Sequence, residues 1–223
     1  MNLELLSKKI SNDLKQELNI DEDKRSIIEY GIFAFFHMAI SILLVALIGL
    51  IFNVMLEALI ISFSGAILRK FSGGAHASTS VNCAVLGVLT SVIPAYISKN
   101  INLNGEFIVI IGVLLYIISL IIIYKLAPVD SPNKPIKKKE KIKRLKRGSI
   151  IILSMFMALV FINIIIYYIK DINLFLLYSS CIYVGVLWQV FTLTKYGHVV
   201  VNKIDSLLIK ILDIRRIKDE KVK

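Results

Sequence analysis

Residues 27–68 read IIEYGIFAFFHMAISILLVALIGLIFNVMLEALIISFSGAIL, an almost continuously apolar run of 42 residues. A helix of about 20 apolar residues crosses a bilayer, so this run is too long for one span. Asn53 and Glu57 are its polar interruptions. We therefore expect two membrane-spanning helices here, at about 27–52 and 54–68.

The rest of the chain continues this pattern. It is 57% hydrophobic with a mean hydropathy of +0.75, whereas a soluble domain is about 45–50% apolar. Because a core of 223 residues cannot hide that much apolar surface, lipid must cover the remainder. The composition predicts an all-α integral membrane protein with about six transmembrane helices. The four further spans are 83–98, 107–124, 149–169 and 174–194.

Both ends of the chain mix apolar and charged residues at helical spacing. We expect amphipathic helices lying in the membrane interface at residues 1–26 and 195–223. A helix packed on a soluble partner is the alternative at the N-terminal end. The apolar stripes are Leu3, Leu6, Ile10, Leu14 and Leu18 at the first end, and Ile204, Leu207, Leu208, Ile211 and Ile214 at the second. The transmembrane domain between the two ends is then 27–194.

Basic residues set the expected orientation, because Lys and Arg are retained on the cytoplasmic side. The loop 125–148 carries ten of them against two acids. With six spans, the basic residues after spans two and six fall on the same side as this loop. The opposite connections hold only Lys99 and Lys170. The count therefore predicts that both termini and the basic loop are cytoplasmic.

Charge and cysteine content exclude several classes of protein. The net charge is +11, but the basic residues cluster between apolar runs, which argues against a nucleic-acid partner. The chain has two cysteines and no CxxC or closely spaced His pair, so we expect no disulfide framework, metal or other cofactor. The polar, charged first 26 residues also predict no cleavable signal peptide.

The stretch RKFSGGAHASTSVNC, residues 69–83, is polar between two apolar runs and falls on the cytoplasmic membrane surface in this topology. His76 and Cys83 could form a base–nucleophile pair. In one continuous helix their Cα atoms would lie about 10 Å apart along the axis. We therefore expect the helix to break between them, and Gly73 and Gly74 supply the backbone freedom.

The same spacing suggests how the cysteine would be activated. If Ser80 caps the third span, Cys83 is the third residue of that helix, where the positive helix end favours a thiolate. His76 could hold the thiolate as an ion pair and return a proton to a leaving amine. The alternative is a packed or snorkelling histidine beside a cysteine that is only a small apolar residue. We interpret the other histidines and cysteine as ordinary side chains: His37, Cys181 and His198.

Four more residues are candidates for supporting roles. Gly73 and Gly74 could admit a substrate backbone or present amides to an oxyanion. Arg69 could grip a carboxylate. Glu29 lies near the inner mouth of the first span, where an ionisable residue is a functional candidate, and it could orient His76.

Residues 69–83 resemble the signature of the accessory gene regulator B (AgrB) family, in which an Arg, a Gly-x-His core and a Cys seven residues after the His recur. A second stretch, YKLAPVDSPNKP at 124–135, is similar to the family's APV–NKP loop. The match extends over most of the chain in length, in the order of apolar runs and in the position of the basic loop.

The resemblance implies a membrane cysteine endopeptidase of quorum-sensing bacteria. Such enzymes cut the C-terminal tail from a short precursor peptide, AgrD, and close a thiolactone or lactone ring. Cys83 would be the nucleophile and His76 the base, with Arg69 and Gly74 at supporting positions. The transmembrane domain 27–194 would be catalytic, in the bacterial cytoplasmic membrane, with its site on the cytoplasmic side. The expected partners are an AgrD-like peptide, the lipid bilayer and a second copy of the chain.

Other functions remain open at this point. The basic segment 134–147 could attract an acidic peptide tail, or it could be a solvated loop facing lipid headgroups. A non-enzymatic small transporter or peptide exporter is the second hypothesis. It predicts that Cys83 tolerates Ser or Ala, and its one candidate buried ionisable residue well inside a span is His37. A scaffold for a histidine kinase is the third.

Overall fold

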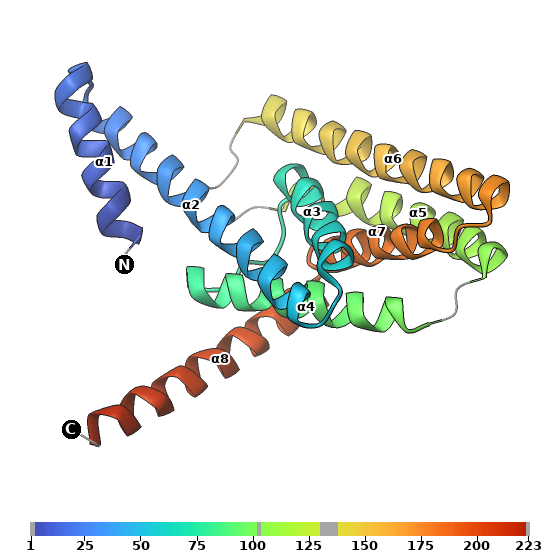
Figure 1. Cartoon of the computed structure of the whole chain (residues 1–223). Helices are drawn as coiled ribbons and strands as arrows, with labels where there is room; N and C mark the ends of the chain where they lie inside the picture. The colour runs from blue at the N-terminus through green and yellow to red at the C-terminus, as the bar shows by residue number, and fades with distance from the viewer. Residues whose placement is uncertain (1–2, 102–103, 130–137, 222–223) are drawn as a thin grey trace. The chain divides into compact units, whose positions relative to one another are not determined.

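The computed structural model describes residues 3–101, 104–129 and 138–221, with side chains described as far as residue 211. Within these ranges the chain is helical almost throughout and contains no strand (Figure 1). The predicted all-α class is therefore confirmed. The helices are α1 (Leu3–Leu18), α2 (Glu22–Ile51), α3 (Met55–Ser72), α4 (Ser80–Lys99), α5 (Gly105–Leu126), α6 (Lys139–Lys170), α7 (Leu174–Phe191) and α8 (Lys195–Lys221).

Five of these helices are long and apolar enough to cross a membrane: α2, α4, α5, α6 and α7. The expected span at 54–68 is also a helix, α3, but it is not among the five. Its 18 residues include Glu57, Arg69 and Lys70, and charged side chains are costly in lipid. A sixth span therefore stays a prediction.

Helix α6 starts ten residues earlier than the expected span at 149. The loop predicted at 125–148 is therefore helical from Lys139 onward. Lys, Arg and Leu are good helix formers, and the last proline of the chain is Pro135. Residues 130–137 of this loop lie outside the described residues.

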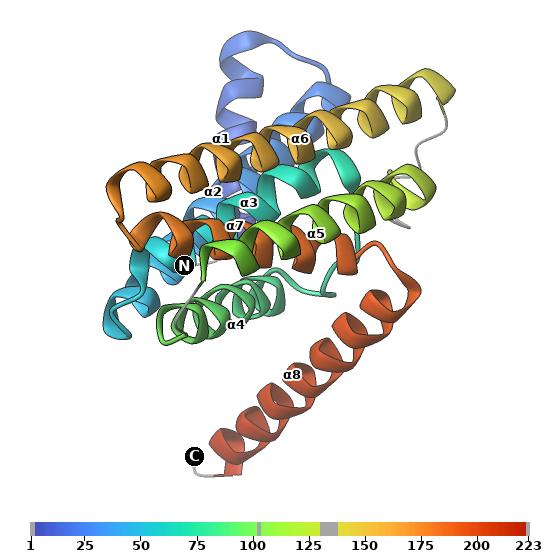
Figure 2. The ribbon, with the colours of Figure 1, turned by 90° about the vertical axis from the view of Figure 1, so that its right-hand side faces the viewer.

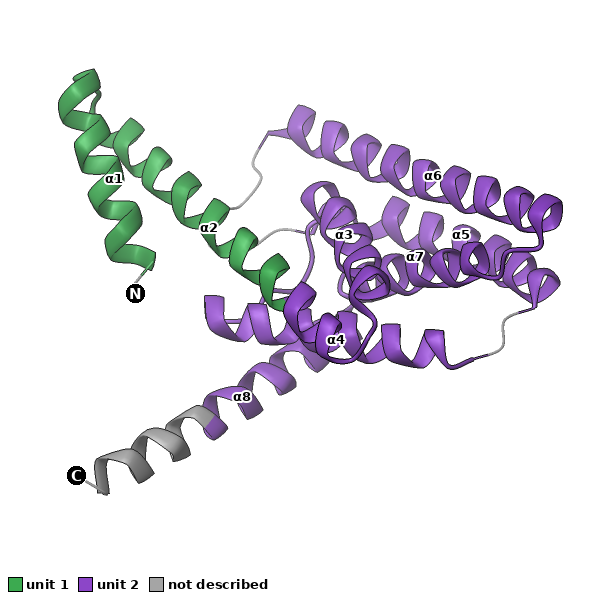
Figure 3. Ribbon diagram, in the orientation of Figure 1, with its two compact units in different colours: residues 1–44 green, residues 45–223 purple. Residues whose placement is uncertain are grey.

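The chain divides into two compact units, residues 1–44 and residues 45–223 (Figure 3). In the first unit, the most deeply buried residues of α1 are Ser7 and Ser11. Arg25 of α2 donates to the Ser11 hydroxyl at 3.4 Å. Leu18, at the end of the predicted apolar stripe, is 61% exposed. The face of α1 that carries Ser7 and Ser11 thus packs within the unit. That the leucine stripe lies in the membrane interface stays a prediction.

In the second unit, α3 and α7 lie side by side, with α4, α5 and α6 packed around them (Figure 2). The two central helices lie in close contact at Gly185. A Cβ there would lie 2.5 Å from the Ile61 carbonyl oxygen of α3. Small residues at such crossings let helix backbones approach without a gap. The α3–α7 pair thus forms the centre of this unit, and the neighbouring helices pack against it.

Glu57 is a deeply buried ionisable residue, with a side chain that is 9% exposed and 3.7 Å from Lys99. Its position in the first turn of α3 lets Lys99, at the end of α4, reach it. His37 is only partly covered and stacks on Phe33, with ring centroids 6.2 Å apart.

The apolar stripe of the C-terminal helix does not pack on the rest of the unit, so its expected place in the membrane interface stays a prediction. Leu207 and Ile211 of that stripe are 58% and 60% exposed, whereas Val201 and Asp205 are buried. Residues 201 and 205 lie one turn apart on α8, so they share a face. A polar residue on the packed face was not anticipated from periodicity, which seeks apolar positions.

Candidate active site

The helix break expected between His76 and Cys83 is present. Helix α3 ends at Ser72 and α4 begins at Ser80, and residues 73–79 between them are not helical. Gly73 and Gly74 have φ angles of 69° and 134°, a range that residues with a Cβ rarely adopt. These two glycines thus let the chain leave α3 at this point.

The space around the two glycines is filled by the chain itself. A Cβ on Gly73 would lie 2.0 Å from the Val129 carbonyl oxygen, and one on Gly74 would lie 2.6 Å from the Thr192 hydroxyl. The Gly73 amide donates to the Arg69 carbonyl at 2.9 Å, so it already closes the end of α3. These contacts indicate that both glycines are needed for close packing. The Gly73 amide is already hydrogen-bonded, so it is not available to an oxyanion in this conformation.

The C-terminal end of α7 holds the non-helical segment in place. The Gln189 side-chain amide donates to the Gly73 carbonyl at 2.6 Å and to the Ser72 hydroxyl at 2.9 Å. The Ala75 amide donates to the Thr192 carbonyl at 3.1 Å. Gln189 and Thr192 are 1% and 0% exposed, and buried hydrogen bonds of this kind fix backbone conformation. Neither residue was predicted from the sequence. Both are polar residues in the apolar run 174–194, and this could have marked them as buried hydrogen-bonding groups.

Arg69 lies close enough to both candidate catalytic residues to interact with them electrostatically. Its guanidinium donates to the Ala75 carbonyl, and its positive charge acts on both Cys83 and His76. No carboxylate lies within 4.0 Å of Arg69 in the described part of the chain. Arg69 could therefore still bind a carboxylate, as expected. One of its N–H groups is already bonded to the carbonyl of Ala75, the residue before His76.

His76 reaches solvent but is surrounded by groups that disfavour its charged form. Partial burial, then the positive charges of Arg69 and His198, lower the pKa of His76 from 6.5 to about 4. The imidazole is therefore neutral at pH 7, and the expected thiolate–imidazolium pair stays a prediction. No hydrogen bond joins His76 to Cys83 among the side chains described, as is common before substrate binds.

Thr79, and not Ser80, caps α4. Thr79 is extended, at φ −121° and ψ 155°, and its hydroxyl accepts from the Asn82 amide at 3.1 Å. The Cys83 amide donates to the Thr79 carbonyl at 3.0 Å, so Cys83 is the fourth residue of the helix rather than the third. Cys83 is partly exposed, whereas Cys181 in α7 is fully buried.

Helix α8 also reaches this region. The Asn82 side-chain amide donates to the Asp205 carboxylate at 2.8 Å. Burial by itself raises the pKa of Asp205, but the hydrogen bonds from Asn82 and Ser78 outweigh it and lower that pKa below 3.8. The carboxylate is therefore charged at neutral pH. Nothing in the sequence pattern pointed to this contact, because 123 residues separate its partners.

With this geometry in place, the family follows from the sequence match. Residues 7–193 match the family described as Accessory gene regulator B. The chain belongs to the AgrB family. The resemblance predicted from residues 69–83 and 124–135 is thereby confirmed, and family membership links the chain to accessory gene regulation in quorum sensing.

Individual AgrB relatives match over different lengths. A putative AgrB-like protein of Clostridium perfringens (strain SM101 / Type A) is 42% identical over 213 residues, covering 94% of this chain and 100% of that protein. A putative AgrB-like protein 2 of C. perfringens (strain 13 / Type A) is 40% identical over the same shares. Accessory gene regulator protein B of Staphylococcus intermedius is 32% identical over 112 residues, 50% of this chain and 57% of that protein. No solved structure matches the chain.

The second AgrB-like stretch contributes to the site through its first residues. The Val129 amide donates to the Ser72 carbonyl at 2.9 Å, so the APV segment pairs with the end of α3. Ala127 in this segment is 3% exposed. Residues 130–135, which complete the APV–NKP stretch, lie outside the described residues.

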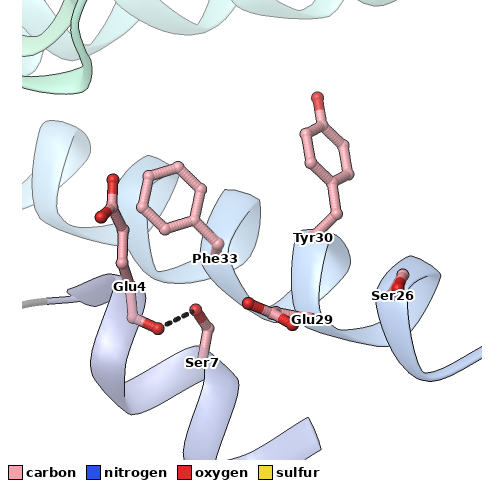
Figure 4. A pocket seen from close by; sticks show the side chains of 6 residues that line it. All are labelled: Glu4, Ser7, Ser26, Glu29, Tyr30 and Phe33. Atoms are coloured by element: carbon pink, nitrogen blue, oxygen red, sulfur yellow. Dashed lines mark hydrogen bonds between the residues drawn. The ribbon is translucent and has the colours of Figure 1, made fainter. Parts of the chain in front are cut away.

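Glu29, the remaining candidate, belongs to the first compact unit. It lines a cavity of about 310 Å³ together with Glu4, Ser7, Ser26, Tyr30 and Phe33 (Figure 4). Its carboxylate accepts from the Arg25 guanidinium at 2.6 Å, one turn earlier on α2. Glu29 is thus ion-paired within its own unit, and its role toward His76 stays a prediction.

Proposed function

We propose that the chain is a membrane-embedded cysteine endopeptidase that removes the C-terminal tail of an AgrD-like quorum-sensing propeptide and cyclises the remainder. The observation that carries the proposal is the interruption between α3 and α4. It puts a neutral histidine in the connecting segment and a partly exposed cysteine in the next helical turn, with the charge of Arg69 acting on both.

In the first step His76 acts as a general base. It takes the proton of the Cys83 thiol as the sulfur attacks the scissile carbonyl carbon. The positive charge of Arg69 stabilises both the sulfur anion and the oxygen anion of the tetrahedral intermediate. The imidazolium then protonates the leaving amine, the C–N bond breaks, and the peptide remains on Cys83 as a thioester.

In the second step a thiol or hydroxyl within the peptide attacks the thioester carbonyl. His76 takes its proton and returns it to the departing Cys83 sulfur, which releases a thiolactone or a lactone. Thioester exchange is close to neutral in free energy, so water must be kept from the same carbonyl. The packing of residues 73–79 against the ends of α7 and α5 supports such exclusion on one side.

We place this site at the cytoplasmic face of the bacterial membrane, in a chain that crosses the bilayer six times with both termini inside. In support, residues 58–68 of α3 carry no charge between Glu57 at one end and Arg69 at the other. An 18-residue helix is about 27 Å long, close to the thickness of the hydrocarbon layer. The domain scheme 1–26, 27–194 and 195–223, with interfacial helices at both ends, belongs to this proposal.

Two partners complete the proposal. The basic start of α6, with six Lys and Arg in residues 139–147, would attract the acidic tail of the precursor on the cytoplasmic side. A second copy of the chain would form a homodimer. The charges of α6 remain available for the tail because Glu140 is the single acid among them.

The direct test is cleavage of a precursor peptide by the chain in vesicles. We expect Cys83→Ala to abolish cleavage, and His76→Ala to prevent formation of the Cys83-linked acyl intermediate. Cys181→Ala is the matched control, since Cys181 is fully buried in α7 and should leave cleavage unchanged. Undiminished cleavage by a correctly inserted Cys83→Ala chain would end the proposal and favour the transporter or exporter.

A further inference from the structure

We infer that helix α8 is part of the active site, and that Asp205 is a positioning residue that fixes the turn carrying Cys83. The catalytic part of this inference rests on the proposed function. The hydrogen bond between Asn82 and Asp205 is observed independently of it. Asp205 comes late in the chain, in the segment that hydropathy alone assigned to the membrane interface.

The Asp205 carboxylate lies beside the cap that starts α4. It accepts from the side chain of Asn82, directly before Cys83, at 2.8 Å. Ser78, directly before the cap residue Thr79, also lowers the pKa of this carboxylate, so it lies close by. The carboxylate thus bonds to the residue before Cys83 and lies near the end of the segment that carries His76. A negative charge at this point also complements the positive end of α4.

Asn82 makes this contact sensitive to substitution. Its side chain is 1% exposed, and its Oδ1 atom has no hydrogen-bond partner in the part of the chain that the structure describes. The bond from Nδ2 to Asp205 is thus what satisfies the buried amide. Without an acceptor at 205 the amide would be unsatisfied at both ends, and the first turn of α4 would shift to reach water.

Helix α8 is itself held firmly enough to act as a support. A Cβ on Gly197 would lie 2.1 Å from the Phe191 carbonyl oxygen, so α8 starts in close contact with the end of α7. Val201, one turn before Asp205, is 1% exposed. The charge of His198, on the same part of α8, acts on His76. The first turns of α8 therefore lie close to His76 and bond to the residue before Cys83.

An exchange of the two hydrogen-bonding groups tests the inference. Asn82→Asp alone opposes two carboxylates across a 2.8 Å contact and should slow cleavage on the order of 10- to 100-fold, as expected for a displaced reactive group. Asp205→Asn alone keeps an acceptor and should have a smaller effect. The double variant Asn82→Asp/Asp205→Asn restores an amide–carboxylate pair, with Ser78 still able to donate, and should recover to within about threefold of the parent chain.

The readout includes the thiol itself. In a Cys181→Ala background Cys83 is the only cysteine, so its rate of alkylation by iodoacetamide can be followed in vesicles. Alkylation should slow in Asn82→Asp and recover in the double variant, alongside kcat, while the amount of inserted protein stays constant. Ser206→Ala is the matched control, because Ser206 is exposed and bonds only within α8.

Two outcomes overturn the inference. One is an Asn82→Asp chain that is alkylated and cleaves at the parent rate. The other is a double variant that remains as slow as Asn82→Asp. Failure of the proposed function has a different signature: Cys83→Ala would still cleave, while alkylation of Cys83 in the other variants would still follow the exchange.

Discussion

The two ends of α3 are closed in different ways. At its N-terminal end the chain turns through residues 52–54 with local hydrogen bonds, such as Val54 amide to Gly49 carbonyl at 2.7 Å. At its C-terminal end residues 73–79 are held by Gln189 and Val129, which are distant in sequence. The first turn receives one exposed bond from elsewhere, donated by Lys99 to the Asn53 carbonyl. The second connection is held by the ends of two other helices, α7 and α5, and it carries His76.

The charged residues at the two ends also differ: one is ion-paired and the other is not. Glu57, near the first end, is paired with Lys99 at 3.7 Å. Arg69, near the second end, has no carboxylate within 4.0 Å among the described residues, and its charge acts on Cys83 and His76. A paired charge stabilises packing, while an uncompensated one is free to stabilise a developing anion. The N-terminal end of α3 thus has a structural role, whereas the C-terminal end is suited to the proposed catalysis.

The largest expected effect comes from the glycines of the second end. Gly73→Ala should lower cleavage by about 100-fold or more. The new Cβ would lie 2.0 Å from the Val129 oxygen at a residue with a φ of 69°, so the segment must move. Gly87→Ala is the control, since nothing lies within 4 Å of a Cβ there. Equal activity in the two alanine variants, measured per inserted chain, would contradict this view of the segment.

Gln189→Leu should have the next largest effect. The partly buried Gly73 carbonyl loses its donor, which costs about 1 kcal/mol of unfolding free energy. We expect cleavage to fall about tenfold as the segment loosens. Asn100→Ala removes an exposed side-chain bond at the end of α4 and is the control. The comparison fails if both variants cleave at the parent rate.

The pH dependence reports on His76. Because its folded pKa is about 4 and its ordinary value is 6.5, the unfolded chain binds more protons between those values. Stability therefore falls as the pH drops from 6.5 toward 4, and is unaffected by this group above 6.5. The rate of cleavage should likewise be retained at mild acidity and fall with a midpoint near pH 4. A midpoint at 6.5, measured on the intact chain, would show that His76 is not shifted by its neighbours.

Glu57→Gln should have the smallest effect on activity. Its partner Lys99 is 37% exposed, so losing the pair should lower the unfolding free energy by about 1 kcal/mol. Cleavage should stay within about twofold of the parent, because this end of α3 carries no catalytic group. A tenfold loss of cleavage with unchanged stability would mean that the two ends of α3 are coupled.

Local sequence signals were enough to predict the helix break and the approximate positions of the apolar helices. Gly73 and Gly74 mark the break by themselves, because few other residues allow their backbone angles. The cap was predicted one residue late, at Ser80 instead of Thr79, because Ser78, Thr79 and Ser80 all have a hydroxyl that can cap a helix.

The supports of the site could not be derived in this way. Gln189 lies 116 residues from Gly73, and Asp205 lies 123 residues from Asn82. Periodicity identifies a face of a helix but not the residue that this face meets. For α8 the apolar stripe includes the exposed residue Leu207, whereas the packed face carries the charged residue Asp205, which an apolar pattern does not reveal.

The span of 116 residues between Gly73 and Gln189 has a consequence for the timing of activity during synthesis. At about 5–20 residues per second, a ribosome needs roughly 6–23 seconds to add that length of chain. During this interval the histidine and cysteine have already been made, but the helix ends that shape their connection have not. If the proposed function holds, a nascent chain should therefore be inert toward newly made peptide around it, and competence should arrive only with α7 and α8.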